Sequence, residues 1–253
     1  MTAKKSLIST DTAIPFDQQQ GSPSTGASRV YRALRRDILF GKFGPGTKLS
    51  LPALHTRYDV GLIPIREALN RLAAERLIIQ EDQRGFFVRS PSAEELDELT
   101  KTRCWAHEMM VRETIATATP QWEDKLVLAA HHLFRADRNA NGSDALSLEW
   151  EAHHRHFHMT LVEGCASRWM QEFHAGLFDY NDFYRYQYTS AERAAVKRDV
   201  GAEHRALFDA AIARDTEALV KQLNDHVRHT ARILASGIPA SSASKPRMAQ
   251  AKA

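Results

Sequence analysis

Hydrophobic residues return every three or four positions in the first third of the chain, which is the spacing of one buried helix face. Val30, Leu34 and Ile38 predict a helix over residues 29–40. A turn rich in glycine and proline follows, and a second helix is predicted over residues 51–58. Polar residues fill most other positions, so each helix has one face to bury and one face for water.

A third amphipathic segment follows a short turn. Ile65, Leu69 and Leu72 share one helix face, while the arginines of this segment fall elsewhere. Pro64 suits the first turn of a helix because it has no amide hydrogen and a fixed φ. We therefore expect a helix over residues 64–75. Two short helices joined by a glycine-containing turn are typical of a helix-turn-helix.

Two short apolar runs come next, at residues 77–80 and 85–88. The polar residues 81–84 separate them, so the pattern predicts a β-hairpin. A hairpin that follows a helix-turn-helix is the wing of a winged helix. Arg84 lies at the predicted tip, where it could reach a phosphate or the minor groove.

Beyond residue 90 the hydrophobic pattern is helical almost throughout. Ser92 with Glu95 three residues later is a capping box, and we place the domain boundary there. Helices are predicted over residues 96–118, 143–164, 167–188, 191–213 and 217–236, and a further helix is predicted to begin at residue 120. The predicted fold class is therefore mainly α.

The domain organisation follows from these patterns. We expect a disordered arm (residues 1–28), a winged helix-turn-helix (29–90), an all-α helical bundle (91–238) and a disordered tail (239–253). Both terminal segments are polar and rich in small residues, so neither can bury a core.

Charge separates the two predicted domains. Residues 29–90 contain twelve Lys or Arg and six Asp or Glu, a net of +6, whereas the whole chain has a formal net charge of +3. The first 28 residues balance, so residues 91–253 carry about −3. A basic small domain joined to a mildly acidic larger one suits a reader of double-stranded DNA, and a merely solvated basic face is the alternative.

Other features exclude some classes of protein. The two cysteines, Cys104 and Cys165, show no CxxC spacing, so we interpret both as reduced thiols. The N-terminus lacks the apolar core of a signal peptide. No apolar run approaches the roughly 18 residues that a membrane-spanning helix needs. We expect a cytoplasmic protein without a membrane partner.

Short motifs in the N-terminal domain make the interpretation more specific. Gly44-Pro45-Gly46 precedes Leu49, Pro64-Ile65-Arg66-Glu67-Ala68-Leu69 opens the third helix, and Arg84-Gly85 closes the hairpin. Over about sixty residues without a gap, this pattern resembles the N-terminal domain of the GntR family of bacterial transcription regulators. Where many members carry a Ser-Arg-Thr-like run, this chain has Gly61-Leu62-Ile63.

The resemblance implies a homodimer whose 64–75 helices enter the major grooves of a palindromic operator. Arg66 and Asn70 would read bases or phosphates, and the other candidates would supply phosphate contacts. The full set of DNA-contact candidates is Arg35, Arg36, Arg66, Asn70, Arg84 and Gly85.

The C-terminal domain resembles the ligand-sensing domain of the FadR branch of this family, called the FCD domain. The matching residues are Phe157-His158, Leu161, Glu203-His204-Arg205-Ala206-Leu207, Asp209-Ala210, Ala213-Arg214-Asp215 and His226. Within that branch, the segments WEAHHRHFHMTLVEGCASRWM, FYRYQYTS and RDVGAEHRALFDAAIARD are most similar to CsiR-like regulators.

Four of the twelve histidines indicate a metal site. His154 and His158 are four residues apart, so they project from one helix face at a usual two-ligand spacing. His204 and His226 lie on two successive predicted helices, which can bring them into one core. Four imidazoles suit Zn²⁺, Ni²⁺ or Mn²⁺-like ions, while the alternative is a set of core histidines satisfied by hydrogen bonds.

The resemblance to the sensing domain supports the metal interpretation. It implies that His158, His204 and His226 are ligands, and His154 stands where the family often has Asp or Asn. It also implies a small carboxylate effector at an open coordination position, with an arginine that pairs its other end. Arg103 and Arg185 are the candidates, with ordinary salt bridges as the alternative.

Three functions remain in competition at this level. The first is a dimeric transcription regulator, most simply a repressor, whose DNA affinity a small organic acid controls. The second is a DNA-binding dimer without an effector, in which the histidines are structural. The third is an all-α metalloenzyme with an accessory winged helix, although the sequence has no HExxH motif.

Overall fold

The structure is a computed structural model that describes residues 25–138, 147–188 and 198–239. Two compact units make up the chain. The winged-helix unit comprises Met1–Arg36 and Lys48–Phe87, and the helical unit comprises Asp37–Thr47 and Val88–Ala253. Most of the predicted N-terminal arm (residues 1–24) and the tail from residue 240 lie outside the described residues, so both stay predictions.

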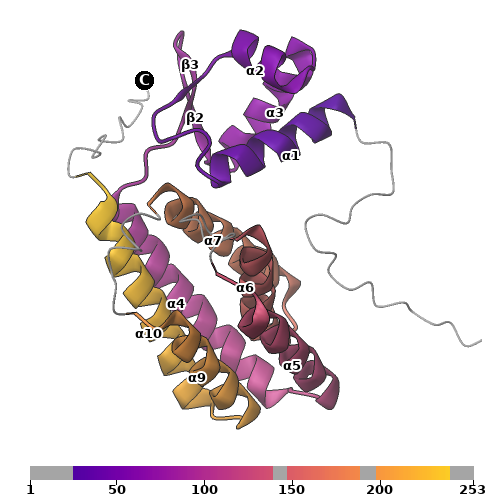
Figure 1. Ribbon diagram of the computed structural model, residues 1–253, viewed down its shortest axis with the longest axis vertical. Coiled ribbons are helices and arrows are strands. Elements are labelled where there is room, and N and C mark those ends of the chain that lie inside the picture. The colour runs from indigo at the N-terminus through magenta and orange to yellow at the C-terminus, as the bar shows by residue number, and fades with distance from the viewer. Residues whose placement is uncertain (1–24, 139–146, 189–197, 240–253) are drawn as a thin grey trace, which may run out of the picture. The chain divides into compact units, whose positions relative to one another are not determined.

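The winged-helix unit contains three helices and a small sheet (Figure 1). The helices are α1 (Gly26–Leu39), α2 (Leu51–Tyr58) and α3 (Leu62–Ala74), and the strands are β1 (Lys48–Leu49), β2 (Ile78–Glu81) and β3 (Gly85–Val88). The sheet order is β1-β3-β2, and β1 pairs antiparallel with β3 through Lys48↔Phe87 and Leu49↔Phe86. Residues from all three helices form the core, among them Leu34, Leu54, Ile65, Leu69 and Leu72.

Three details of this unit differ from the sequence predictions. Helix α1 begins at Gly26 rather than at residue 29, because the Thr25 hydroxyl accepts a hydrogen bond from the Ser28 amide and caps the helix. Helix α3 begins at Leu62 rather than Pro64, since Gly61 takes the cap position. Strand β1 was not predicted, because two residues are too short to show alternation.

The helical unit consists, over the described residues, of helices that pack against one another (Figure 1). They are α4 (Ala93–Ala116), α5 (Pro120–Arg135), α6 (Leu148–Thr160), α7 (Arg168–Gln187), α9 (Val200–Ile212) and α10 (Thr216–Gly237). Helix α4 packs along α10 and α7, α5 packs against α6 and α9, and α9 packs against α10. A buried apolar cluster fills the space between them, with Met110, Leu126, Phe157, Leu207 and Leu223 among its members.

Side-chain caps define the starts of these helices. The predicted capping residue Ser92 accepts a hydrogen bond from the Glu95 amide, 3.1 Å away. The other caps are Thr119, Ser147, Ser167, Asp199 and Asp215, each of which accepts from the amide three residues later. These bonds satisfy amides that have no partner within the helix.

Two predicted helices were too long. The helix predicted over residues 143–164 spans Leu148–Thr160, because Ser147 caps it; residues 143–146 lie outside the described part. The helix predicted over residues 191–213 has its observed start at Val200, because Asp199 is its cap; residues 191–197 lie outside the described part. Among the described residues, no helix is long and apolar enough to cross a membrane.

Candidate functional site

Four histidines from three helices converge inside the helical unit. His154 and His158 lie one turn apart on α6, His204 lies on α9, and His226 lies on α10. All four side chains are buried, and one nitrogen of each lies within 4.8 Å of those of the others. The four-histidine cluster therefore has the donor type and the compactness that a divalent metal requires.

The chemistry of the cluster fits a metal ion. Burial lowers the pKa of His154, His158 and His204 well below the ordinary value, and the neighbouring imidazoles lower it further. The rings are therefore neutral near pH 7 and have lone pairs to donate. The Nε2 atoms of His158 and His204 are 3.1 Å apart, a separation that fits either a hydrogen bond between neutral rings or two ligands of one ion.

A carboxylate orients His226. The Nδ1 atom of His226 lies 2.7 Å from Oε2 of Glu203, so we assign the ring proton to Nδ1 and the lone pair to Nε2. A carboxylate behind a histidine is the usual outer partner of a metal ligand, since it fixes the tautomer and raises the basicity of the ring. Burial alone would raise the pKa of Glu203, but hydrogen bonds from Arg198 and His226 lower it well below its usual range.

Arg198 holds this carboxylate in place. Its guanidinium donates to both oxygens of Glu203, at 2.8 and 2.6 Å, and to the hydroxyl of Thr230 at 2.9 Å. Such a two-point pair fixes direction as well as charge. The Glu203–Arg198 pair therefore keeps His226 aimed at the other three imidazoles.

A pocket opens beside the histidines, and Arg103 lines it. The Arg103 side chain is 3% exposed, and its guanidinium lies over the ring of Phe178 with 5.4 Å between their centres. Its Nε atom is buried and has no hydrogen-bond partner among the described residues. Burial lowers the pKa of Arg103 to about 10, yet the group stays charged at neutral pH. A buried cation with a free donor is a place for an anion.

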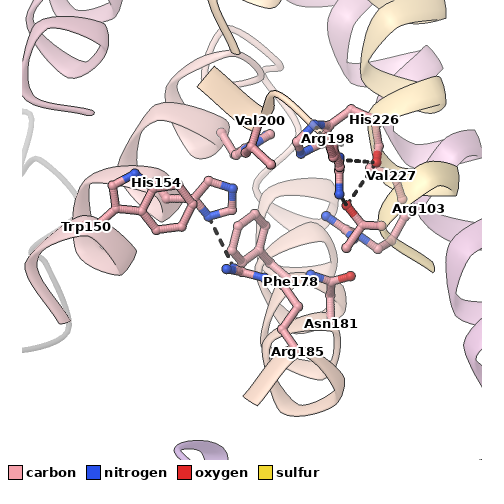
Figure 2. A pocket seen from close by; sticks show the side chains of 12 residues that line it. Arg103, Trp150, His154, Phe178, Asn181, Arg185, Arg198, Val200, His226 and Val227 are labelled. Atoms are coloured by element: carbon pink, nitrogen blue, oxygen red, sulfur yellow. Dashed lines mark hydrogen bonds between the residues drawn. The ribbon is translucent and has the colours of Figure 1, made fainter. Parts of the chain in front are cut away.

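Arg185, the other predicted effector residue, lines the same pocket but is already paired. Its two terminal nitrogens lie 3.0 and 2.6 Å from the oxygens of Glu151, and both side chains are buried. One of these nitrogens also lies 3.4 Å from Nδ1 of His154 (Figure 2). The structure therefore places Arg185 behind His154, engaged by a carboxylate of the protein itself.

In the winged-helix unit, the predicted DNA contacts divide into exposed and internal residues. Arg36, Arg66 and Asn70 are exposed, the last two on the outer face of α3. Arg35 is instead buried, and its Nε donates to Glu75 at 2.9 Å. Its guanidinium is therefore engaged within the unit rather than held out for a phosphate, and the prediction of a phosphate contact at Arg35 has no support in this geometry.

The wing has the predicted tip. Arg84 is largely exposed, forms an ion pair with Glu81, and lies over the ring of Phe87 at 5.4 Å. Gly85 has φ +97 and no atom within 4 Å of the position that a Cβ would occupy. Only glycine adopts this backbone conformation without strain, so Gly85 lets the strand begin directly after the basic tip.

Sequence reasoning did not pair the residues that support the site with the histidines they contact. Glu203 precedes His204 in the sequence but hydrogen-bonds His226 on the next helix, and Arg198 stands before a helix start. Trp150 packs its ring on His154, with 4.6 Å between the ring centres. Two histidines spaced four residues apart on a helix indicate metal ligands. No spacing rule indicates which carboxylate or aromatic ring contacts each histidine.

Comparisons with known proteins agree with this architecture. Residues 27–88 match the family described as bacterial regulatory proteins of the gntR family, and residues 98–229 match the FCD domain. The chain is 33% identical over 199 residues to the HTH-type transcriptional repressor GlaR of Escherichia coli K12. The matched region covers 78% of this chain and 90% of the relative. It is 32% identical over 206 residues to the HTH-type transcriptional regulator BphR of Paraburkholderia xenovorans LB400, covering 81% and 83%. The fold is similar to that of McbR/YncC from E. coli, with TM-score 0.68, 20% identity and coverage of 84% and 98%.

Proposed function

Because this chain belongs to the gntR family of bacterial transcription regulators and carries an FCD domain, we propose that it is an effector-controlled repressor. In this proposal a homodimer binds an operator, and a small organic acid bound in the helical unit lowers the operator affinity. The observation that carries the proposal is the four-histidine cluster beside the buried cation Arg103. The FadR branch and the likeness to CsiR-like regulators stay predictions.

The residues that would hold a metal are His154, His158, His204 and His226. Their buried, neutral nitrogens support a Zn²⁺, Ni²⁺ or Mn²⁺-like ion. When bound, such an ion supplies a Lewis-acidic position that a carboxylate oxygen can occupy. Glu203 keeps the lone pair of His226 directed at the cluster, while Arg185 and Glu151 hold a charged pair behind His154.

Arg103 would bind the effector. Its side chain lines the pocket and leaves a buried N–H without a partner among the described residues. An N–H that lost its water on folding gains most from a charged acceptor, so a carboxylate suits it better than a neutral group. Arg185 would bind the effector only if its ion pair with Glu151 opened, so we assign the main contact with the effector to Arg103.

An exposed apolar surface supports the homodimer. Trp105 and Met109 lie one turn apart on α4, and Trp169 and Phe173 lie one turn apart on α7. Helices α4 and α7 pack against each other, and each carries large apolar side chains that are about half exposed or more. Large apolar side chains left exposed in this way are typical of protein–protein contacts. A second copy of this chain is the occupant that a palindromic operator demands.

The DNA contacts would come from the exposed residues of the winged-helix unit. Arg66 and Asn70 project from α3, the second helix of the helix-turn-helix, which is the helix that enters the major groove. Arg36 and the wing residues Arg84 and Gly85 would meet the backbone.

The DNA-binding part is tested with Arg66→Ala. We expect the variant to fold as the wild type does, because the side chain is exposed, and to lose specific binding to the upstream DNA of its own gene. The measurement is fluorescence anisotropy at physiological salt with excess scrambled duplex as competitor. Arg228→Ala, an exposed arginine on α10, is the matched control. Unchanged affinity of Arg66→Ala for the specific duplex contradicts the assignment.

The effector part is tested with Arg103→Gln and His158→Ala. Small mono- and dicarboxylic acids are screened for release of the DNA from wild-type protein, and metal content is measured in parallel. We expect both variants to bind DNA and to lose the response to the acid, with metal lost only in His158→Ala. A metal-free wild type that no acid affects would instead favour a DNA-binding dimer without an effector.

A further inference from the structure

The first turn of α3 exposes two adjacent large apolar side chains. Leu62 is 53% exposed and Ile63 is 83% exposed, the latter as much as any large hydrophobic residue that the structure describes. The buried face of the same helix includes Ile65, Leu69 and Leu72, none of which has exposed surface. Ile63 falls on the opposite side of the helix from these three residues, so it makes no contribution to the core.

Ile63 stands in line with the polar residues of the exposed face. Arg66 and Asn70 follow it at three and seven positions, so the three side chains form one stripe along α3. The stripe begins at the end of the helix where Gly61 provides no side-chain cap and the first turn holds no acidic residue. The first turn therefore holds no side-chain charge that repels a phosphate, and the exposed Glu67 stands only in the second turn. The amino-terminal residues of a recognition helix are those that meet base edges.

The chemistry of Ile63 restricts what it can recognise. Its side chain has neither a donor nor an acceptor, so it gains nothing from the polar edges of guanine, cytosine or adenine. Among the four bases, thymine alone presents an apolar group in the major groove, the C5-methyl. An isoleucine that meets this methyl removes apolar surface of both partners from water.

We propose that Ile63, flanked by Leu62, reads thymine in the operator through its C5-methyl group. Arg66 and Asn70 then contact the next bases or phosphates along the same groove. This inference rests on the proposal that α3 enters the major groove, and it adds a specificity that charge alone does not give. It requires the protein to distinguish thymine from cytosine and, more sharply, from uracil, which keeps every hydrogen-bonding group of thymine and lacks only the methyl.

The test uses a duplex that the full-length protein selects from a random pool. Each thymine of the selected site is replaced in turn by deoxyuridine, and the dissociation constant is measured at fixed salt. We expect one or two positions per half-site at which uracil weakens binding about fourfold, the effect of one buried methyl. Against Ile63→Ala the same substitutions should have no effect, whereas Ile63→Val should keep most of the wild-type sensitivity.

Controls separate this inference from general loss of binding. Leu128→Ala removes a similarly exposed apolar side chain from α5 and should retain the full wild-type pattern. Thermal unfolding of Ile63→Ala should match the wild type, since the side chain packs against nothing in the core. Tight binding with no uracil effect, or a uracil effect that survives in Ile63→Ala, overturns the inference and leaves operator binding intact. A pool that yields no enriched sequence overturns both.

Discussion

The two units place their functional side chains in opposite ways. The winged-helix unit keeps an apolar core and carries Arg66 and Asn70 on its surface, where water and salt reach them. In the helical unit the candidate functional side chains are inside: Arg103, Arg185 and the four-histidine cluster are all buried.

This difference determines how each unit gains and loses energy. Exposed charges interact weakly with one another and are screened by salt, so they are available to a phosphate at little cost. Buried charges interact strongly, and each depends on a particular partner that compensates for lost water. A surface of the first kind suits reversible DNA binding, and an interior of the second kind suits selection among small ligands.

The largest expected effect comes from breaking a buried pair. Glu151→Gln removes the carboxylate that both terminal nitrogens of Arg185 contact, and leaves a buried guanidinium without its main counter-charge. Removal of one partner of such a pair costs about 3 to 5 kcal/mol. We expect the free energy of unfolding of the helical unit, measured by urea denaturation, to fall by that amount.

The corresponding change in the winged-helix unit is the control. Glu81→Gln breaks the ion pair with Arg84 at the tip of the wing, where both groups are in contact with solvent. Surface pairs contribute roughly 0–1 kcal/mol, so we expect almost no change in stability. Equal losses for the two variants would contradict the contrast between the units.

The fold could be predicted from sequence because it depends on local patterns. The predicted bounds of α2 match the observed ones, and serine three residues before glutamate marked the start of α4. The errors arose where one capping residue outweighs the pattern, as with Ser147 and Asp199. A cap depends on one side-chain hydrogen bond, and apolar periodicity carries no information about it.

The candidate site was only partly predictable. His154 and His158 show their relation in the sequence, since they lie one helical turn apart. The pairing of Arg185 with Glu151 cannot be seen in the sequence, because the two residues are 34 positions apart and lie on different helices, α7 and α6. Both Arg103 and Arg185 are effector candidates in the sequence. In the structure, Arg103 has a buried N–H that can donate to an anion, whereas Arg185 is already bonded to Glu151.

The next largest effect is expected from low pH, which should lower the stability of the helical unit. Burial lowers the pKa of His107 well below 6.5 and that of His174 to about 3, and the two Nε2 atoms lie 3.1 Å apart. The unfolded chain therefore binds protons below pH 6.5 that the folded chain does not, so stability is retained above this value and lost as the pH falls. At one pH unit below 6.5, each of the two histidines should lower the free energy of unfolding by about 1.4 kcal/mol relative to high pH.

This loss can be assigned to the helical unit. Chemical denaturation in the presence of a chelator, at pH 7.5, 6.5 and 5.5, gives the free energy of unfolding at each pH. In the winged-helix unit, the one described histidine, His55, is exposed. A His107→Gln/His174→Gln variant should show a smaller slope with pH than the wild type, and an equal slope in both proteins would contradict the assignment.

The smallest effect, and the most specific, is expected at Glu203. Glu203→Gln keeps the size of the side chain but removes the charge that fixes the Nδ1 proton of His226, so the imidazole becomes a weaker donor without leaving the cluster. Loss of an outer partner of this kind typically lowers metal affinity 10- to 100-fold. Competition with a chromophoric chelator measures this directly, and Glu217→Gln, an exposed carboxylate at the start of α10, is the matched control. If Glu203→Gln binds metal as tightly as the wild type, then Glu203 serves only to neutralise Arg198, and His226 owes its orientation to packing alone.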